Sequence, residues 1–92
     1  MKFLMFGRYS SESLARIGSQ RTEMAKSIIS KHGGEIEKIY ALLGETDLVL
    51  VVDLPDGAKA LHASIVMSKE TGIQFRTSPA VEVEDFDQMM DD

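Results

Sequence analysis

The chain of 92 residues contains no cysteine and only two prolines. The absence of cysteine excludes disulfides, thiolate metal sites, iron–sulfur clusters and a nucleophilic thiol, and it is compatible with a reducing cytosol. The core must therefore be held together by packing alone. With 43% hydrophobic side chains, the expected organisation is one domain near the small end of the range in which a single core suffices.

Long apolar runs are also missing from the sequence. No apolar stretch approaches the roughly 20 residues needed to cross a bilayer. The apolar residues at positions 1–6 are too few, and too close to Arg8, to form the hydrophobic region of a secretory signal. We therefore expect a cytoplasmic protein without a membrane partner.

The sequence has no excess of positive charge, since its formal net charge is -5. Residues 82–92 hold six of the 15 acidic residues and no Lys or Arg, which leaves 9 acidic against 10 basic residues in positions 1–81. Neither part offers the dense basic surface that binding phosphates requires, so we expect no nucleic-acid partner. The chain divides into a domain at 1–81 and an acidic C-terminal segment at 82–92, expected to be a short helix or a tail.

The spacing of apolar residues predicts the element order strand, helix, strand, strand, helix, strand. The strands are expected at 2–6, 35–43, 48–54 and 73–77. The first helix begins after Ser10, with Gly18 dividing it into a short and a longer piece, and the second ends at Thr71 with Asp56 as its N-cap. In the second helix, the side chains expected to face the core are Ala58, Leu61, Ile65 and Ser68.

This order is the ferredoxin-like βαββαβ arrangement of the α+β class. Right-handed crossovers place both helices on one face of a four-stranded antiparallel sheet, with the first and third strands in the middle. Residues 3–6 and 48–52 of these central strands are apolar at odd and even positions alike, although a strand with one wet face should alternate. Both faces must therefore be covered. We expect the face without helices to meet the same face of a second subunit in a barrel-like homodimer, or in a higher oligomer.

Three stretches of the sequence, "MKFLMFGRYS", "ALLGETDLVLVVDLPD" and "TGIQFRTSPAVEVEDF", together resemble the GYD domain family over nearly the whole chain. This family belongs to the dimeric α/β-barrel superfamily, so the resemblance implies a ferredoxin-like dimer. Its Gly-Tyr-Asp signature falls on the hairpin, where the glycine is Gly44 and the aspartate is Asp47. The tyrosine position holds Thr46, which lacks the ring and the phenol of the signature.

The superfamily implied by this resemblance is functionally diverse. It includes haem-degrading and quinol-forming monooxygenases, lactone isomerases and the effector-binding modules of leucine-responsive regulators. Those modules also have a glycine and an aspartate in a comparable hairpin, which serves effector binding at subunit contacts. A shared fold gives only an analogy for function.

The hairpin at 44–47 holds the first candidate site residues. Gly44 can supply a positive φ, and Asp47 can either cap the turn through nearby amides or accept a hydrogen bond from a ligand. Both roles are compatible. Tyr40 on the preceding strand can orient a ligand through its hydroxyl, or simply pack with one wet tip.

Charged and imidazole side chains give the remaining candidates. Arg8 and Arg76, on strands expected to be neighbours, can hold a carboxylate ligand between them or pair with local acidic residues. His32 is positioned to interact favourably with a helix C-terminus. His62 is either a haem ligand or a partly buried helix residue. Two isolated histidines have no further ligand at useful spacing, so we expect no metal site, and the sequence identifies no cofactor.

Two functional hypotheses follow. In the first, a homodimer binds a small organic ligand in a pocket between helices and sheet and is either a binder or a cofactor-free enzyme. The residues expected to line that pocket are Phe6, Tyr40, Asp47 and either Arg8 or His62. In the second, the protein is a free-standing regulatory module whose hairpin at 44–47 binds an effector between associated dimers. A third hypothesis is a stable dimer that binds a protein partner through its acidic C-terminal segment.

Overall fold

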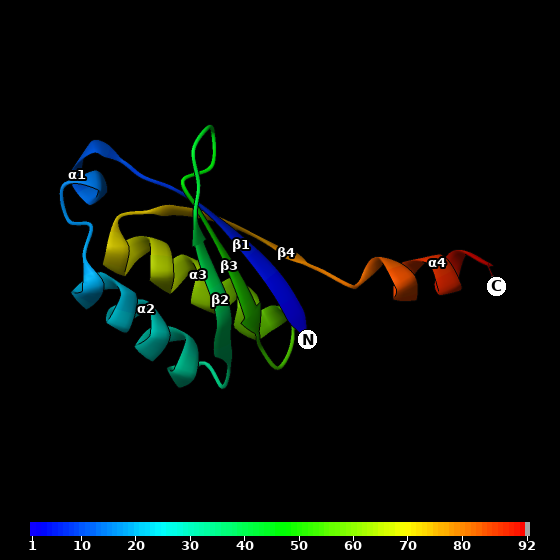
Figure 1. Cartoon of the computed structure of the whole chain (residues 1–92). Helices are drawn as coiled ribbons and strands as arrows, with labels where there is room; N and C mark the ends of the chain where they lie inside the picture. Colours follow the sequence, from blue (N-terminus) through cyan, green and yellow to red (C-terminus); the bar gives the residue numbers. More distant parts are fainter. Residues whose placement is uncertain (92) are drawn as a thin grey trace.

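Four antiparallel strands and four helices make up the computed structural model, which describes residues 1–91 (Figure 1). The strands lie in the sheet order β2-β3-β1-β4, with β1 and β3 in the middle. This architecture confirms the expected α+β, ferredoxin-like fold. The elements in chain order are β1 (Lys2–Arg8), α1 (Ser11–Leu14), α2 (Ser19–Lys31), β2 (Glu35–Ala41), β3 (Leu48–Asp53), α3 (Gly57–Thr71), β4 (Gln74–Pro79) and α4 (Val83–Asp91).

The ends of the helices follow the chemistry of their capping residues. Ser10 caps α1 in a reciprocal capping box with Ser13. The Asp56 side chain caps α3 by accepting a hydrogen bond from the backbone N–H of Lys59 at 2.8 Å. Gly72 ends α3 in the left-handed conformation, with φ 74°. The predicted limits of α3 are therefore confirmed, and the predicted division of the first helix at Gly18 separates α1 from α2.

The core lies between one face of the sheet and the helices α2 and α3. Strand register places Phe3 and Met5 of β1 beside Val52 and Leu50 of β3 on this face. Every one of these four side chains is buried. They pack against buried side chains of both helices, which are Ala25, Ile28, Ile29, Ala60, Ala63 and Met67.

The face that α3 turns to the core differs from the prediction. Leu61 and Ile65, expected inside, are 64% and 53% exposed. The buried positions of α3 are Ala60, Ala63, Met67 and Thr71, about half a helical turn away from the predicted stripe. Two alanines on the buried side, Ala60 and Ala63, leave room for α3 to pack closely against β4. The prediction was wrong because it oriented the helix by Leu61 and Ile65, whereas the buried stripe contains Ala60, Ala63 and Met67.

The second face of the sheet is apolar along its centre. Leu4 and Phe6 of β1 lie in register with Val51 and Val49 of β3, and all four side chains are half-buried. Tyr40 of β2 pairs with Val49 on the same face and is 49% exposed. In residues 1–91, both helices that cover the sheet, α2 and α3, lie on the opposite side (Figure 1). We call the surface formed by Leu4, Phe6, Tyr40, Val49 and Val51 the open face.

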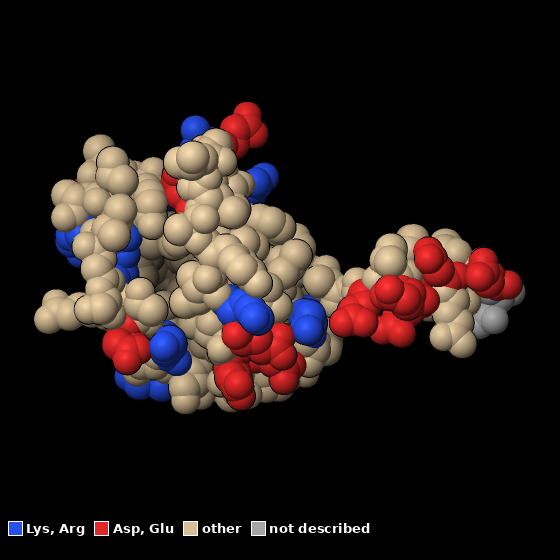
Figure 2. Space-filling view, in the orientation of Figure 1, with Lys and Arg blue, Asp and Glu red and all other residues tan. Residues whose placement is uncertain are grey.

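Residues 83–91 of the acidic C-terminal segment form α4, which extends away from the rest of the molecule (Figure 1), and Asp92 lies outside the described residues. None of its residues is buried. Its apolar side chains are exposed, including Phe86 at 46% and Met90 at 64%. Figure 2 shows acidic side chains distributed along this arm. None of the helices within the described residues is both long and apolar enough to cross a membrane.

Candidate functional site

A cavity of about 400 Å³ opens at one end of the molecule, between the first half of α2, the sheet and the last turns of α3. Its walls are mainly apolar, and a few polar side chains accompany them. The apolar lining comes from Ile17, Ala25, Ile39, Ala41, Leu48, Leu50, Met67, Ile73 and Phe75. The polar side chains are Tyr9, Arg21, Thr22 and Thr71.

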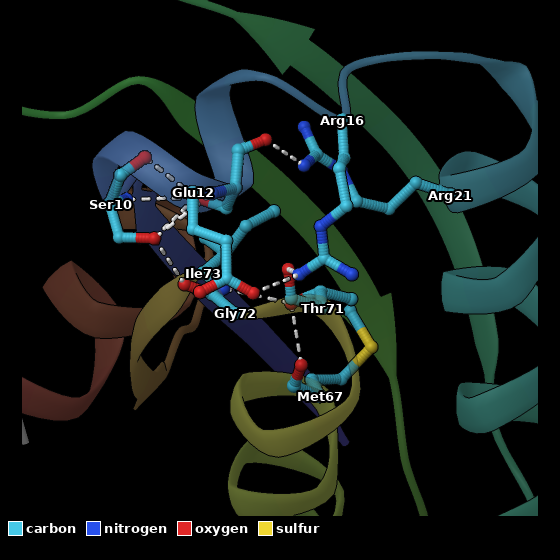
Figure 3. Close-up of polar contacts among 9 residues, drawn as sticks. Ser10, Glu12, Arg16, Arg21, Met67, Thr71, Gly72 and Ile73 are labelled. Carbon is cyan, nitrogen blue, oxygen red and sulfur yellow. Dashed lines mark hydrogen bonds and ion pairs between the residues drawn. The ribbon is translucent and has the colours of Figure 1, made fainter.

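One lip of the cavity is the segment around α1, which is tied to the C-terminal end of α3 (Figure 3). The Ser10 hydroxyl donates to the carbonyl oxygen of Gly72 at 3.1 Å. An Nη of Arg16 donates to the carbonyl oxygen of Thr71 at 3.3 Å and lies 3.6 Å from the Glu12 carboxylate. These contacts satisfy carbonyl oxygens that α3 leaves free at its C-terminal end. They also anchor the segment that leads to Ile17 and Gly18, two lining residues of the cavity.

Thr71 lines the cavity, but its hydroxyl is used within the protein. It donates to the carbonyl oxygen of Met67 at 2.6 Å and accepts from the backbone N–H of Ile73 at 3.1 Å (Figure 3). Thr71 is fully buried, so these two bonds meet the requirement that a buried hydroxyl be paired. Its part in the site is to fix the turn from α3 into β4.

Arg21 is the one cation among the lining residues of the described chain. It is half-buried in the first turn of α2, and its Nη1 donates to the carbonyl oxygen of Ser13. Its guanidinium carbon lies 5.1 Å from the centroid of the Tyr9 ring, within cation–π range. Among residues 1–91, Arg21 forms no ion pair with a carboxylate. Figure 2 shows basic side chains at the end of the molecule where α1 meets α2.

The hairpin between β2 and β3 is joined to the end of β1 through Asp47. Its Oδ2 accepts from the backbone N–H of Tyr9 at 2.8 Å. Its backbone N–H donates to the carbonyl oxygen of Gly7 at 2.9 Å, and its carbonyl oxygen accepts from the N–H of Leu42 at 2.8 Å. The side chain therefore caps the end of a neighbouring strand and not the hairpin's own turn, which corrects that part of the prediction. Gly44 has the expected positive φ, at 118°.

The family model of the GYD domain matches residues 3–90 of the chain. The chain belongs to the GYD domain family. No curated protein matches the sequence. The match confirms the resemblance inferred from the sequence and extends from β1 into α4.

In this GYD domain, the signature positions of the hairpin have separate surroundings. Asp47 fixes the backbone of Tyr9, and Tyr9 in turn lies beneath Arg21 at the cavity. Thr46 faces a different hollow, of about 270 Å³, on the opposite side of the sheet. The aspartate of the signature therefore supports the cavity indirectly, while the position that holds threonine lines the second hollow.

Most of the residues predicted to line a helix–sheet pocket lie on that opposite side. Phe6, Arg8 and Arg76 come together in the second hollow with Glu45, and Tyr40 belongs to the open face. Strand register explains the separation, because Phe6 pairs with Arg76 and points away from the helices. The expected lining is therefore corrected: a helix–sheet cavity exists, but other residues form it. Within residues 1–91, neither arginine of the hollow pairs with an acidic residue.

His62 lies at the other end of the helix layer. It is exposed, and not partly buried as expected, with its ring edge-to-face against His32 at a centroid distance of 4.7 Å. His32 follows the C-terminus of α2, and its Nδ1 donates to the carbonyl oxygen of Ile28 at 2.7 Å. This contact agrees with the predicted role at a helix end. No group of three metal-ligating side chains was found among the residues that the structure describes.

The sequence reasoning missed Tyr9, Arg21 and Thr22 as cavity residues. One signal pointed to Arg21, since it stands three positions after the N-cap Gly18, in the first turn of α2. A cation there meets the positive end of the helix dipole, which is locally unfavourable. A locally unfavourable residue of this kind is expected where its function or its tertiary contacts outweigh the local cost.

Proposed function

We propose that this GYD domain is a homodimeric small-ligand-binding protein whose ligand occupies the cavity between the helices and the sheet. The cavity itself is the observation that carries the proposal. Its volume of about 400 Å³ lies in the range of about 300–1,000 Å³ that is typical of small-molecule sites. Apolar walls with a few polar groups on one side are also typical of such sites.

The lining supports binding more directly than catalysis. Tyr9 supplies a phenol and Arg21 a guanidinium, and both are positioned at the same side of the cavity. A cofactor-free enzyme would need a proton carrier beside its substrate. Among the described lining residues, Tyr9 is the side chain suited to that role. Catalysis would therefore depend on Tyr9, whereas binding would tolerate its replacement by phenylalanine.

Native mass spectrometry of gently purified protein tests the ligand. We expect a defined extra mass on the wild-type protein and its loss in Ala41→Phe, which places a large side chain at an exposed position of the cavity wall. Ala58→Phe is the matched control, since Ala58 is an exposed alanine on α3 away from the cavity. Retention of the same mass by Ala41→Phe would show that the ligand lies elsewhere.

The proposed dimer follows from the open face. Leu4, Phe6, Val49 and Val51 form a continuous apolar strip on the two central strands, without alternating polar residues. A second copy supplies an identical apolar strip, so one isologous contact covers both. An uncovered strip of this kind in a sheet centre favours aggregation. A second copy of this chain is therefore the occupant we propose.

Phe6→Glu tests the dimer by placing a charge in the middle of the open face. We expect a dimer mass for the wild-type protein and a monomer mass for this variant in light scattering after size exclusion. Leu61→Glu is the control, because it also replaces a large apolar side chain but lies 64% exposed on α3. If the wild-type protein is a monomer at every concentration, the argument from the open face is wrong.

A second function, regulation by an effector, is favoured by the hollow of about 270 Å³ beside the hairpin. Arg8 and Arg76 line it together with Thr46 of the hairpin, and it adjoins the open face through Phe6. An effector bound there would lie at the border of a subunit contact. This alternative predicts a tetramer or larger assembly whose mass changes when a ligand binds. A dimer of constant mass, with and without ligand, would contradict it.

A further inference from the structure

We infer that the ligand of the cavity is a small organic acid, with a carboxylate on an apolar body, and that Arg21 binds the carboxylate. This inference rests on the proposed function and names its ligand class. It follows from the single uncompensated charge in the lining, from the way the protein holds that charge, and from the apolar walls.

The charge of the lining selects an anion. Arg21 is half-buried and forms no ion pair within residues 1–91. None of the described lining residues is Asp or Glu. A partly buried cation without a counter-charge loses hydration, and the Ser13 carbonyl oxygen and the Tyr9 ring replace only part of it. A ligand anion restores the missing partner, whereas a ligand cation meets only repulsion.

The contacts of Arg21 favour a planar anion such as a carboxylate. One Nη donates to the Ser13 carbonyl oxygen, and the guanidinium carbon lies 5.1 Å from the centroid of the Tyr9 ring. These two contacts restrict the side chain before a ligand arrives, which reduces the entropy lost on binding. A guanidinium carries five N–H donors in a planar fork that matches a carboxylate in bidentate geometry. One bond to Ser13 leaves donors available for that pair.

The other lining residues define the body of the acid. Ile39, Leu48 and Phe75 are partly buried and present hydrocarbon and aromatic surface from the sheet. Leu50 and Met67 lie behind this surface as fully buried side chains. The Thr71 hydroxyl is already bonded to Met67 and Ile73, so it offers little to a polar group of the ligand. An apolar chain or ring fits these walls, because a polar body would lose water without gaining partners.

Two probes with the same body separate charge from shape. We would titrate the protein with 3-phenylpropanoate and with 3-phenylpropanamide, and follow backbone amide shifts by NMR. The expected result is that both probes shift the amides of Thr22 and Ala25, which line the cavity on α2. The carboxylate should bind at least about tenfold more tightly, as expected for a charge-assisted hydrogen bond.

Variants of Arg21 test whether this side chain causes the tighter binding of the carboxylate probe. Arg21→Gln should remove the preference for the carboxylate, and Arg21→Lys should retain part of it, because lysine keeps the charge without the fork. Arg16→Gln is the matched control. Arg16 belongs to the same lip and also bonds a backbone carbonyl, but it does not line the cavity. The amide spectrum of each variant shows whether the fold is retained, and Arg21→Lys provides the test if Arg21→Gln does not fold.

The outcomes distinguish this inference from the proposed function. Equal binding of the two probes at the cavity amides would overturn the organic-acid assignment and leave a ligand cavity. Failure of both probes to shift those amides would count against the cavity proposal as well. If Arg16→Gln and Arg21→Gln lose the preference for the carboxylate probe equally, the proposed role of Arg21 is wrong. The loss would then come from the α1 segment or from the lower positive charge of the protein.

Discussion

Replacing Asp47 with alanine should lower the free energy of unfolding by about 2 kcal/mol. The structure gives the reason, because Asp47 Oδ2 is the acceptor for the partly buried N–H of Tyr9 at 2.8 Å. Leaving a buried donor without its partner costs about 1–3 kcal/mol. The backbone bonds of Asp47 to Gly7 and Leu42 remain, so the loss should come from the side chain alone.

Asp47→Asn should cost less, about 1 kcal/mol, because the amide oxygen still accepts but the bond loses its charge. For a domain of this size, 1 kcal/mol corresponds to a change in Tm of about 4–8 °C. We therefore expect Tm to fall by about 8–16 °C for alanine and about half of that for asparagine. Thermal unfolding by circular dichroism measures both changes, and hydrogen exchange of the Tyr9 amide should accelerate in the same order.

Glu45→Ala is the control for this pair of variants. Glu45 lies two residues earlier in the same connection and is exposed, so its replacement should change stability by less than about 0.5 kcal/mol. The reasoning is refuted if Asp47→Ala is as stable as Glu45→Ala and the Tyr9 amide exchanges at the wild-type rate. Weaker binding of 3-phenylpropanoate in Asp47→Ala is also expected, because Tyr9 supports Arg21.

Two further predictions concern packing. A Cβ at Gly34 would lie 2.2 Å from the carbonyl oxygen of Asp53 and 2.6 Å from Leu54 Cδ2, so Gly34→Ala should cost about 3 kcal/mol in urea unfolding. Gly18→Ala, where a Cβ meets nothing within 4 Å, should cost less, about 1 kcal/mol at most, because alanine is a poorer N-cap than glycine. Equal stability of the two variants would contradict this packing. Deleting residues 82–92 should leave stability within about 0.5 kcal/mol, because α4 buries no residue. A larger loss that depends on protein concentration would instead indicate that α4 packs on another subunit.

Local patterns were sufficient for the order of the elements and for the limits of α3, whereas each strand differs from its predicted range by one or two residues at one or both ends. Ser10, Asp56 and Gly72 act at helix ends through contacts within a few residues, so their roles are readable from sequence. The two central strands were recognisable as apolar runs, and their sheet order followed from general crossover rules. The inward face of α3 was not predictable in this way. Ala60, Ala63 and Met67 lie on the buried side of that helix, and Leu61 and Ile65 lie on the exposed side. Only packing against the rest of the fold selects between these two apolar stripes.

The sequence by itself determined the ferredoxin-like topology and the positive φ of Gly44 in the hairpin, because hydrophobic period and turn chemistry are local properties. The tertiary structure alone decided the cavity. Tyr9, Arg21 and Thr71 come from three separate segments, and the Asp47 carboxylate bonds an amide 38 positions earlier in the chain. The strand register alone decided that Phe6 and Arg76 face away from the helices. Such contacts depend on how complete elements pack, and no short stretch of sequence encodes them.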